Sequence, residues 1–183
     1  MNMEKFTERS RGFLQSAQTI AIRENQQRVM PEHLLKALMD DDQGLASNLI
    51  TRAGGDAKRV REAVDAAVAK QPKVSGSGSG QVYVDPTLVR VLDEAESVAK
   101  KAGDSFVPAE RVLMALAMVN TNARDALAAG SVNAQALNAA INDIRKGRTA
   151  DTASAEDSYE ALEKYARDLT AAARDGKIDP IIG

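Results

Sequence analysis

The chain of 183 residues contains no cysteine and no tryptophan, and only 3% of its residues are aromatic. The lack of cysteine excludes a disulfide framework and thiol chemistry, and it suits a reducing compartment. Because aromatic residues are so few, the core must be built from Leu, Ile, Val, Met and Ala. The many alanines favour closely packed helices. No apolar run is long enough to span a membrane, and residues 1–10 are polar and mixed in charge, unlike a signal peptide.

The sequence also lacks the residue patterns of catalytic and metal sites. The net charge is −2, with both signs interspersed, which argues against a basic nucleic-acid surface. His33 is the only histidine, and its place in a first helical turn favours a structural role. Residues 73–80 (KVSGSGSG) lack the ending of a phosphate loop, and the acidic run at 40–42 lacks the spacing of a calcium loop. We therefore expect no enzymatic activity and no metal in this chain.

What the sequence does contain is a repeat of one pattern, 78 residues apart. Each copy shows an apolar stripe, a turn, a charged residue and a second stripe, in one order and mostly in one register. We infer two four-helix units, each unable to bury its stripe alone, packed about a pseudo-two-fold axis. The predicted fold class is all-α, with eight helices in two pseudo-symmetric repeats. The matched pairs include Phe13/Val91, Leu14/Leu92, Ala17/Ala95, Ile20/Val98, Ala21/Ala99, Val29/Val107, Glu32/Glu110, Leu35/Leu113, Ala37/Ala115 and Leu38/Leu116.

Capping residues, prolines and glycines predict where the helices begin and end. Asp and Asn cap helix starts, proline suits a first turn, and Gly or Asn suits the left-handed position after a helix. In the first copy we expect one helix from Thr7 to about Glu24, a second that starts at Pro31, a short third that ends at Gly54 and a fourth that follows Asp56. In the second copy the first helix runs from Asp85-Pro86 to Gly103, the second starts at Pro108, the third ends at Gly130 and the fourth follows Asn133.

Composition divides the chain into three parts. Residues 1–146 are expected to form the double-repeat domain, with repeats at about 7–70 and 85–146 joined by a linker at 71–84. Residues 147–158, rich in Ala, Thr, Ser and Asp, are expected to be a flexible linker. Residues 159–183 begin with an amphipathic helix at about 159–174 and look like the start of a further domain that has been cut off.

The chain resembles, over essentially its whole length, the N-terminal region of the Clp family of AAA+ unfoldases. The double-repeat signature is carried by Phe6-Thr7, by residues 31–38 (PEHLLKAL) and by residues 103–107 (GDSFV). The most specific match is residues 161–170 (ALEKYARDLT) followed by 176–183 (GKIDPIIG), which is similar to the beginning of the family's first nucleotide-binding domain. The segments 71–76 and 85–92 favour the disaggregase branch of the family.

This resemblance implies a module that binds unfolded or aggregated polypeptides in a groove. The full-length protein would be a cytoplasmic homohexamer that uses ATP and Mg²⁺ to thread such polypeptides through a central pore, together with the DnaK chaperone system. The present chain is expected to be a monomer that binds no cofactor, nucleic acid or membrane. Ile181 and Ile182 would begin the adenine pocket only in the full-length protein.

By the same resemblance, Thr7, Asp104 and Glu110 match the family's polar substrate contacts. Each also has a structural interpretation: Thr7 as a helix cap, Asp104 as a turn residue, and Glu110 as a first-turn carboxylate, favoured by about 0.3–1 kcal/mol. Val89 and Val98 lie near opposite margins of a broad apolar stripe, so they either reach solvent as apolar contacts or belong to the core. Because Thr7 is in the first copy and the two carboxylates are in the second, a shared groove would cross the interface between copies.

Two other functions remain open at this point. An N-domain of the ClpA or ClpC type would keep the fold but dock adaptor proteins for a protease. A free-standing helical scaffold or DNA-binding repeat would belong to another class, and a mobility shift at low salt would test DNA binding. The sequence beyond Gly183 would separate the family branches: a coiled-coil insertion indicates the disaggregase, and a protease-docking loop indicates the ClpA type.

Overall fold

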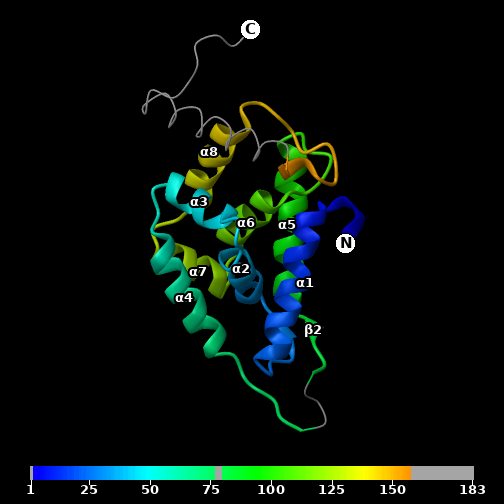
Figure 1. Cartoon of the computed structure of the whole chain (residues 1–183), viewed down its shortest axis with the longest axis vertical. Helices are drawn as coiled ribbons and strands as arrows, with labels where there is room; N and C mark the ends of the chain where they lie inside the picture. The colour runs from blue at the N-terminus through cyan, green and yellow to red at the C-terminus, as the bar shows by residue number, and fades with distance from the viewer. Residues whose placement is uncertain (1, 77–79, 158–183) are drawn as a thin grey trace, which may run out of the picture.

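The computed structural model describes residues 2–76 and 80–157, and within them eight α-helices form two four-helix units (Figure 1). This confirms the predicted all-α fold of two repeats. A 3-10 turn, η1 (Met3–Lys5), precedes the first helix. The first unit contains α1 (Glu8–Arg23), α2 (Pro31–Met39), α3 (Leu45–Arg52) and α4 (Ala57–Ala69); the second contains α5 (Pro86–Lys101), α6 (Ala109–Met118), α7 (Asn122–Ala129) and α8 (Ala134–Arg145).

The helix ends lie close to the positions that capping chemistry predicts. The side chains of Thr7, Asp85, Asp56 and Asn133 each accept a backbone N–H at the start of a helix. Asn25 (φ 57°) and Gly103 (φ 84°) adopt the left-handed conformation after α1 and α5, as their equivalent places in the repeat require. One boundary differs: Pro108 is the N-cap of α6, which begins at Ala109 rather than at the proline.

One continuous core joins the two units. The apolar stripes predicted from the repeat are buried, with α2 and α6 packed at the centre and in contact with each other. Within the units α1 packs against α2 and α5 against α6, and further contacts cross between the units, where α4 packs against α7 and α3 against α8. The largest fully buried side chains come from both copies: Phe6, Leu34, Leu35, Leu38, Met39, Leu49, Ile50, Leu88, Leu92, Leu113, Leu116 and Leu127.

The turns before α4 and α8 approach each other closely. The amide N–H of Asp56 donates to the carbonyl oxygen of Gly130 at 2.8 Å. A methyl group on Gly130 would lie 2.4 Å from Val60 Cγ2 and 2.7 Å from the carbonyl oxygen of Asp56. The φ of Gly130, −94°, suits any residue, so backbone conformation does not require glycine here. Glycine is required because a side chain would collide with Val60 and Asp56.

Two short extended contacts connect the copies crosswise. Strand β1 (Arg28–Val29) pairs in parallel with β2 (Tyr83–Val84), so that Val29 lies opposite Val84. A single parallel bridge joins Phe6 to Val107. Phe6 is equivalent to Val84 in the repeat, and Val29 is equivalent to Val107. In each copy, the segment just before the first helix therefore pairs with the segment just before the second helix of the other copy.

The predicted helix at 159–174 and the residues Ile181 and Ile182 lie outside the described residues. Among the helices that the structure does describe, none is both long enough and apolar enough to cross a membrane.

Candidate functional site

Thr7 lies at the junction of the two repeats. Its backbone N–H donates to the carbonyl oxygen of Val107 at 3.1 Å, and its hydroxyl accepts the N–H of Ser10 as the N-cap of α1. Ser10 Oγ donates to the same carbonyl of Val107 at 2.9 Å. These bonds fix the start of α1 against the segment that leads into α6, and the side chain of Thr7 is fully buried.

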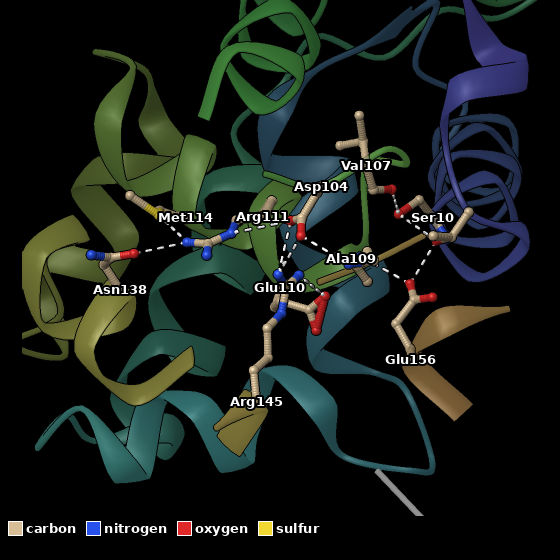
Figure 2. Close-up of polar contacts among 12 residues, drawn as sticks. Ser10, Asp104, Val107, Ala109, Glu110, Arg111, Met114, Asn138, Arg145 and Glu156 are labelled. Carbon is tan, nitrogen blue, oxygen red and sulfur yellow. Dashed lines mark hydrogen bonds and ion pairs between the residues drawn. The ribbon is translucent and has the colours of Figure 1, made fainter. Parts of the chain in front are cut away.

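Asp104 and Glu110 belong to a buried ionic cluster within the second repeat (Figure 2). Nη1 of Arg145 donates to both carboxylate oxygens of Asp104, at 2.6 and 2.8 Å, and Nη2 donates to Glu110 Oε1 at 3.0 Å. Nε of Arg111 lies 3.7 Å from Asp104 Oδ2. The cluster therefore balances two carboxylates with two guanidinium groups, and its side chains are 3% exposed or less.

Three helix ends bring this cluster together. The left-handed turn at Gly103 places Asp104 after α5, Glu110 and Arg111 lie in the first turn of α6, and Arg145 is the last residue of α8. Burial and the positive charge of Arg145 lower the pKa of Arg111, while Asp104 and Glu110 oppose this shift. Buried charges of this kind are stable only while each is paired.

Glu156 connects Thr7 with the start of α6. One of its carboxylate oxygens accepts the hydroxyl of Thr7 at 2.6 Å and the backbone N–H of Ala109 at 3.0 Å. The side chain points toward Ala109 in Figure 2, and the residue is 1% exposed. Because Ala109 is the first residue of α6, its N–H is one of the unsatisfied donors at the positive end of the helix.

Residues 148–157, which we call the strap, carry Glu156 across both repeats. In Figure 1 this segment runs from the end of α8 toward α5 and the start of α1. The carbonyl oxygen of Ala150 accepts the N–H groups of Ser105 and Phe106, and the N–H of Ala150 donates to Asp104 at 2.9 Å. The carbonyl oxygen of Ala153 accepts the N–H of Glu8 at 2.8 Å. These residues, for which composition predicts a flexible linker, thus lie bonded to the site in the structure.

The two predicted apolar residues lie on α5 and differ in exposure. Val89 is half-buried, whereas Val98 is buried at 7% exposure. Val98 lines an open cavity of about 380 Å³ whose wall also includes Met114, Arg111 and Arg145. The structure thus places Val98 beside the two arginines of the cluster, whereas Val89 lies in the first turn of α5.

The first repeat contains a network of hydrogen bonds around His33 and Glu32. His33 Nδ1 accepts the N–H of Met30 at 2.9 Å, so Nε2 carries the proton and donates to Gln26 Oε1. Glu32 accepts the side-chain amides of Gln71 and Asn122. Burial lowers the pKa of His33, opposed by Glu32 and Glu24. The one histidine is thus buried with a hydrogen-bond partner at each ring nitrogen, and among the described residues no group of three His, Cys, Asp or Glu side chains could hold a metal ion.

The sequence analysis missed Arg145 and Glu156. Arg145 had a detectable signal, because it follows Leu137 and Ile141 at helical spacing and so lies on the apolar stripe of α8. A charged residue on a buried stripe indicates a buried ionic partner. Glu156 had no such signal, since it lies in a segment of small polar residues without periodicity.

Comparison with known families and proteins agrees with the fold and the repeat. The family described as "Clp repeat (R) N-terminal domain" matches residues 5–130. The chain therefore belongs to the Clp N-terminal domain family. Among curated relatives, the chaperone protein ClpB of Rhodopseudomonas palustris is 58% identical to this chain over the whole length of this chain. This chain spans 21% of that relative's length.

Solved structures share the fold at low sequence identity. The Hsp104 N-terminal domain from Candida albicans has a TM-score of 0.72 and 18% identity, covering 82% of this chain and 98% of that one. A complex of the ClpV N-domain with a VipB peptide has a TM-score of 0.62 and 19% identity, covering 82% of this chain and 92% of that one. At these identities the similarity establishes the fold.

Proposed function

We propose that this chain is the polypeptide-binding N-terminal module of a ClpB-type, ATP-dependent protein disaggregase. The observation that carries the proposal is the identity of 58% to a ClpB over the whole chain. The module would grip unfolded or aggregated polypeptide and pass it to a hexameric motor for threading. The ClpV N-domain in complex with a VipB peptide supports peptide binding as a capacity of this fold.

We propose further that the binding surface includes Thr7, Asp104 and Glu110, together with Val89 and Val98. In the structure the three polar side chains are buried and hydrogen-bonded, so direct contact requires the strap to leave Thr7. Asp104 and Glu110 would act mainly by holding the segment 103–109 in place through Arg145. Val98, on the wall of the adjoining cavity, would supply apolar contact.

A titration with a permanently unfolded polypeptide tests the proposal. Reduced, carboxymethylated α-lactalbumin carrying a fluorophore is titrated with the chain, and anisotropy reports binding; native α-lactalbumin is the control. We expect weak binding of the unfolded form alone, with little dependence on salt because buried contacts are poorly screened. Equal binding of native and unfolded α-lactalbumin, or none of either, would contradict the proposed function.

The site assignment has its own test in the same titration. Thr7→Ala, Asp104→Ala and Glu110→Ala are compared with Asp143→Ala, which removes an exposed carboxylate that pairs with Arg52. Circular dichroism first establishes that each variant is folded. We expect at least one of the three site variants to change the affinity while Asp143→Ala does not; unchanged affinity in all three would show that the site is wrong.

The activity of the full-length protein belongs to the same proposal. It would be a cytoplasmic homohexamer that binds ATP and Mg²⁺ and cooperates with DnaK, whereas the present chain would be a monomer without enzymatic activity. Ile181 and Ile182 would contribute to the adenine pocket only in that larger protein. A calorimetric titration of this chain with ATP tests the last point, and stoichiometric binding would contradict it.

A further inference from the structure

Glu156 occupies a position built for a carboxylate in general. Its two donors are a hydroxyl, on Thr7, and a backbone N–H, on Ala109. Neither donor is specific for the strap, because any carboxylate that reaches this point can accept the same two bonds. The positive end of the α6 dipole favours a negative charge here from whichever segment supplies it.

The strap is held more by hydrogen bonds than by apolar burial. Ala150 and Ala155 are its buried apolar residues, and they form a small cluster apart from the main core. Such a segment opens at low cost relative to the helices, since it buries few apolar groups. Lys146 (φ 51°) and Gly147 (φ 86°), both left-handed, turn the chain at the point where the strap leaves α8.

The remaining strap contacts lie on both repeats. On the first, Asp157 pairs with Arg9 at 2.7 Å and Ala153 accepts the N–H of Glu8. On the second, Ala150 bonds to the segment after α5. The strap therefore lies across the same junction of repeats that the proposed function assigns to an incoming polypeptide.

We propose that the strap is an internal ligand that closes the Thr7 site, and that an acidic segment of unfolded polypeptide replaces Glu156 there. This inference rests on the proposed function and names both the regulation of that site and the chemistry of its ligand. Because the closed strap competes for the site, the measured affinity for polypeptide is reduced by the fraction of closed molecules.

Two substitutions of Glu156 test the competition. Glu156→Ala removes the two hydrogen bonds that the Glu156 carboxylate accepts from Thr7 and Ala109, so we expect carboxymethylated α-lactalbumin to bind on the order of tenfold more tightly. Glu156→Gln keeps an acceptor without the charge and is expected to lie between wild type and the alanine variant. Asp143→Asn, which removes one exposed negative charge elsewhere, is the matched control and is expected to leave the affinity unchanged.

A double variant separates competition from other effects. In the intact chain Thr7→Ala weakens the strap and the polypeptide alike, so its effect on affinity is small. In the Glu156→Ala background only the polypeptide uses Thr7, and the same change is expected to weaken binding by several-fold. A short unstructured peptide with one central glutamate is expected to bind this background more tightly than its glutamine counterpart.

Hydrogen exchange reports the strap independently of affinity. The amides of Glu8, Ser105 and Phe106, which donate to the strap, are expected to exchange faster in Glu156→Ala and in wild type when polypeptide is added. If unfolded polypeptide binds wild type and both Glu156 variants equally, or binds the variants more weakly, the strap inference is wrong while the proposed function stands. If none of the three binds, the proposed function itself fails.

Discussion

Replacing Arg145 with methionine tests the buried ionic cluster directly. The substitution keeps a long side chain but removes three hydrogen bonds, at 2.6, 2.8 and 3.0 Å, to two carboxylates that are almost fully buried. Arg111 then faces two carboxylates alone, so one negative charge is left uncompensated. Breaking a buried pair in this way costs about 3–5 kcal/mol, a large part of the ~5–15 kcal/mol that stabilises a typical domain.

The matched control is Arg52→Met. Arg52 forms an arginine–aspartate pair with Asp143 at 2.9 Å, but there the side chains are 35% and 69% exposed. Exposed pairs contribute roughly 0–1 kcal/mol because water already solvates both charges. Both variants therefore remove an arginine–carboxylate contact, but at very different burial.

Urea unfolding followed by circular dichroism measures both costs as a shift in the midpoint. Adding Glu110→Gln to Arg145→Met removes the uncompensated charge and should recover part of the loss. The reasoning is refuted if Arg145→Met costs no more than Arg52→Met, or if the added Glu110→Gln destabilises the protein further.

Three more changes have signs fixed by the structure. Gly130→Ala forces a methyl group against Val60 and the backbone of Asp56, and thermal unfolding should show a loss of about 1–3 kcal/mol. Gly12→Ala places a methyl group in open space within α1 and should raise stability by roughly 0.5–1 kcal/mol in the same assay. Burial lowers the pKa of His33, so as the pH falls the unfolded chain takes up a proton before the folded protein does. The folded protein should therefore lose stability, and its urea midpoint should decrease, once the pH is below about 6.5.

Each of these has a contrary outcome. A neutral Gly130→Ala would mean that the turns before α4 and α8 are further apart than described. A destabilising Gly12→Ala would place unseen contacts on that face of α1. For the pH effect the control is His33→Gln, because the chain has one histidine; a drop in stability that persists in that variant would assign it to other groups.

The repeat was enough to predict most of the fold. Caps such as Thr7, Asp56 and Asn133 act within a few residues of chain, so their chemistry is legible in the sequence. The register of 78 residues also placed the two halves in one core. What it could not predict is the crossed pairing of β1 with β2, since strands of two residues leave no periodicity to detect.

The sequence proposes residues for the candidate site but not their arrangement. Resemblance selected Thr7, Asp104 and Glu110, and the structure places Thr7 at the junction between the repeats and the two carboxylates in an ionic cluster of the second repeat. Their burial depends on Arg145 and Glu156, which lie far along the chain. Contacts over such separations depend on the tertiary path of the strap, which small polar residues do not encode locally.

The crossed pairing of Phe6 with Val107 and of Val29 with Val84 has a consequence for the integrity of the chain. Each half completes the other, as subunits do in a domain-swapped dimer, but here one covalent chain supplies both partners. A backbone nick between residues 76 and 80 would therefore release nothing: the fragments would stay interlocked through their exchanged segments. The peptide that joins the halves sets their local concentration, and the exchange holds them together.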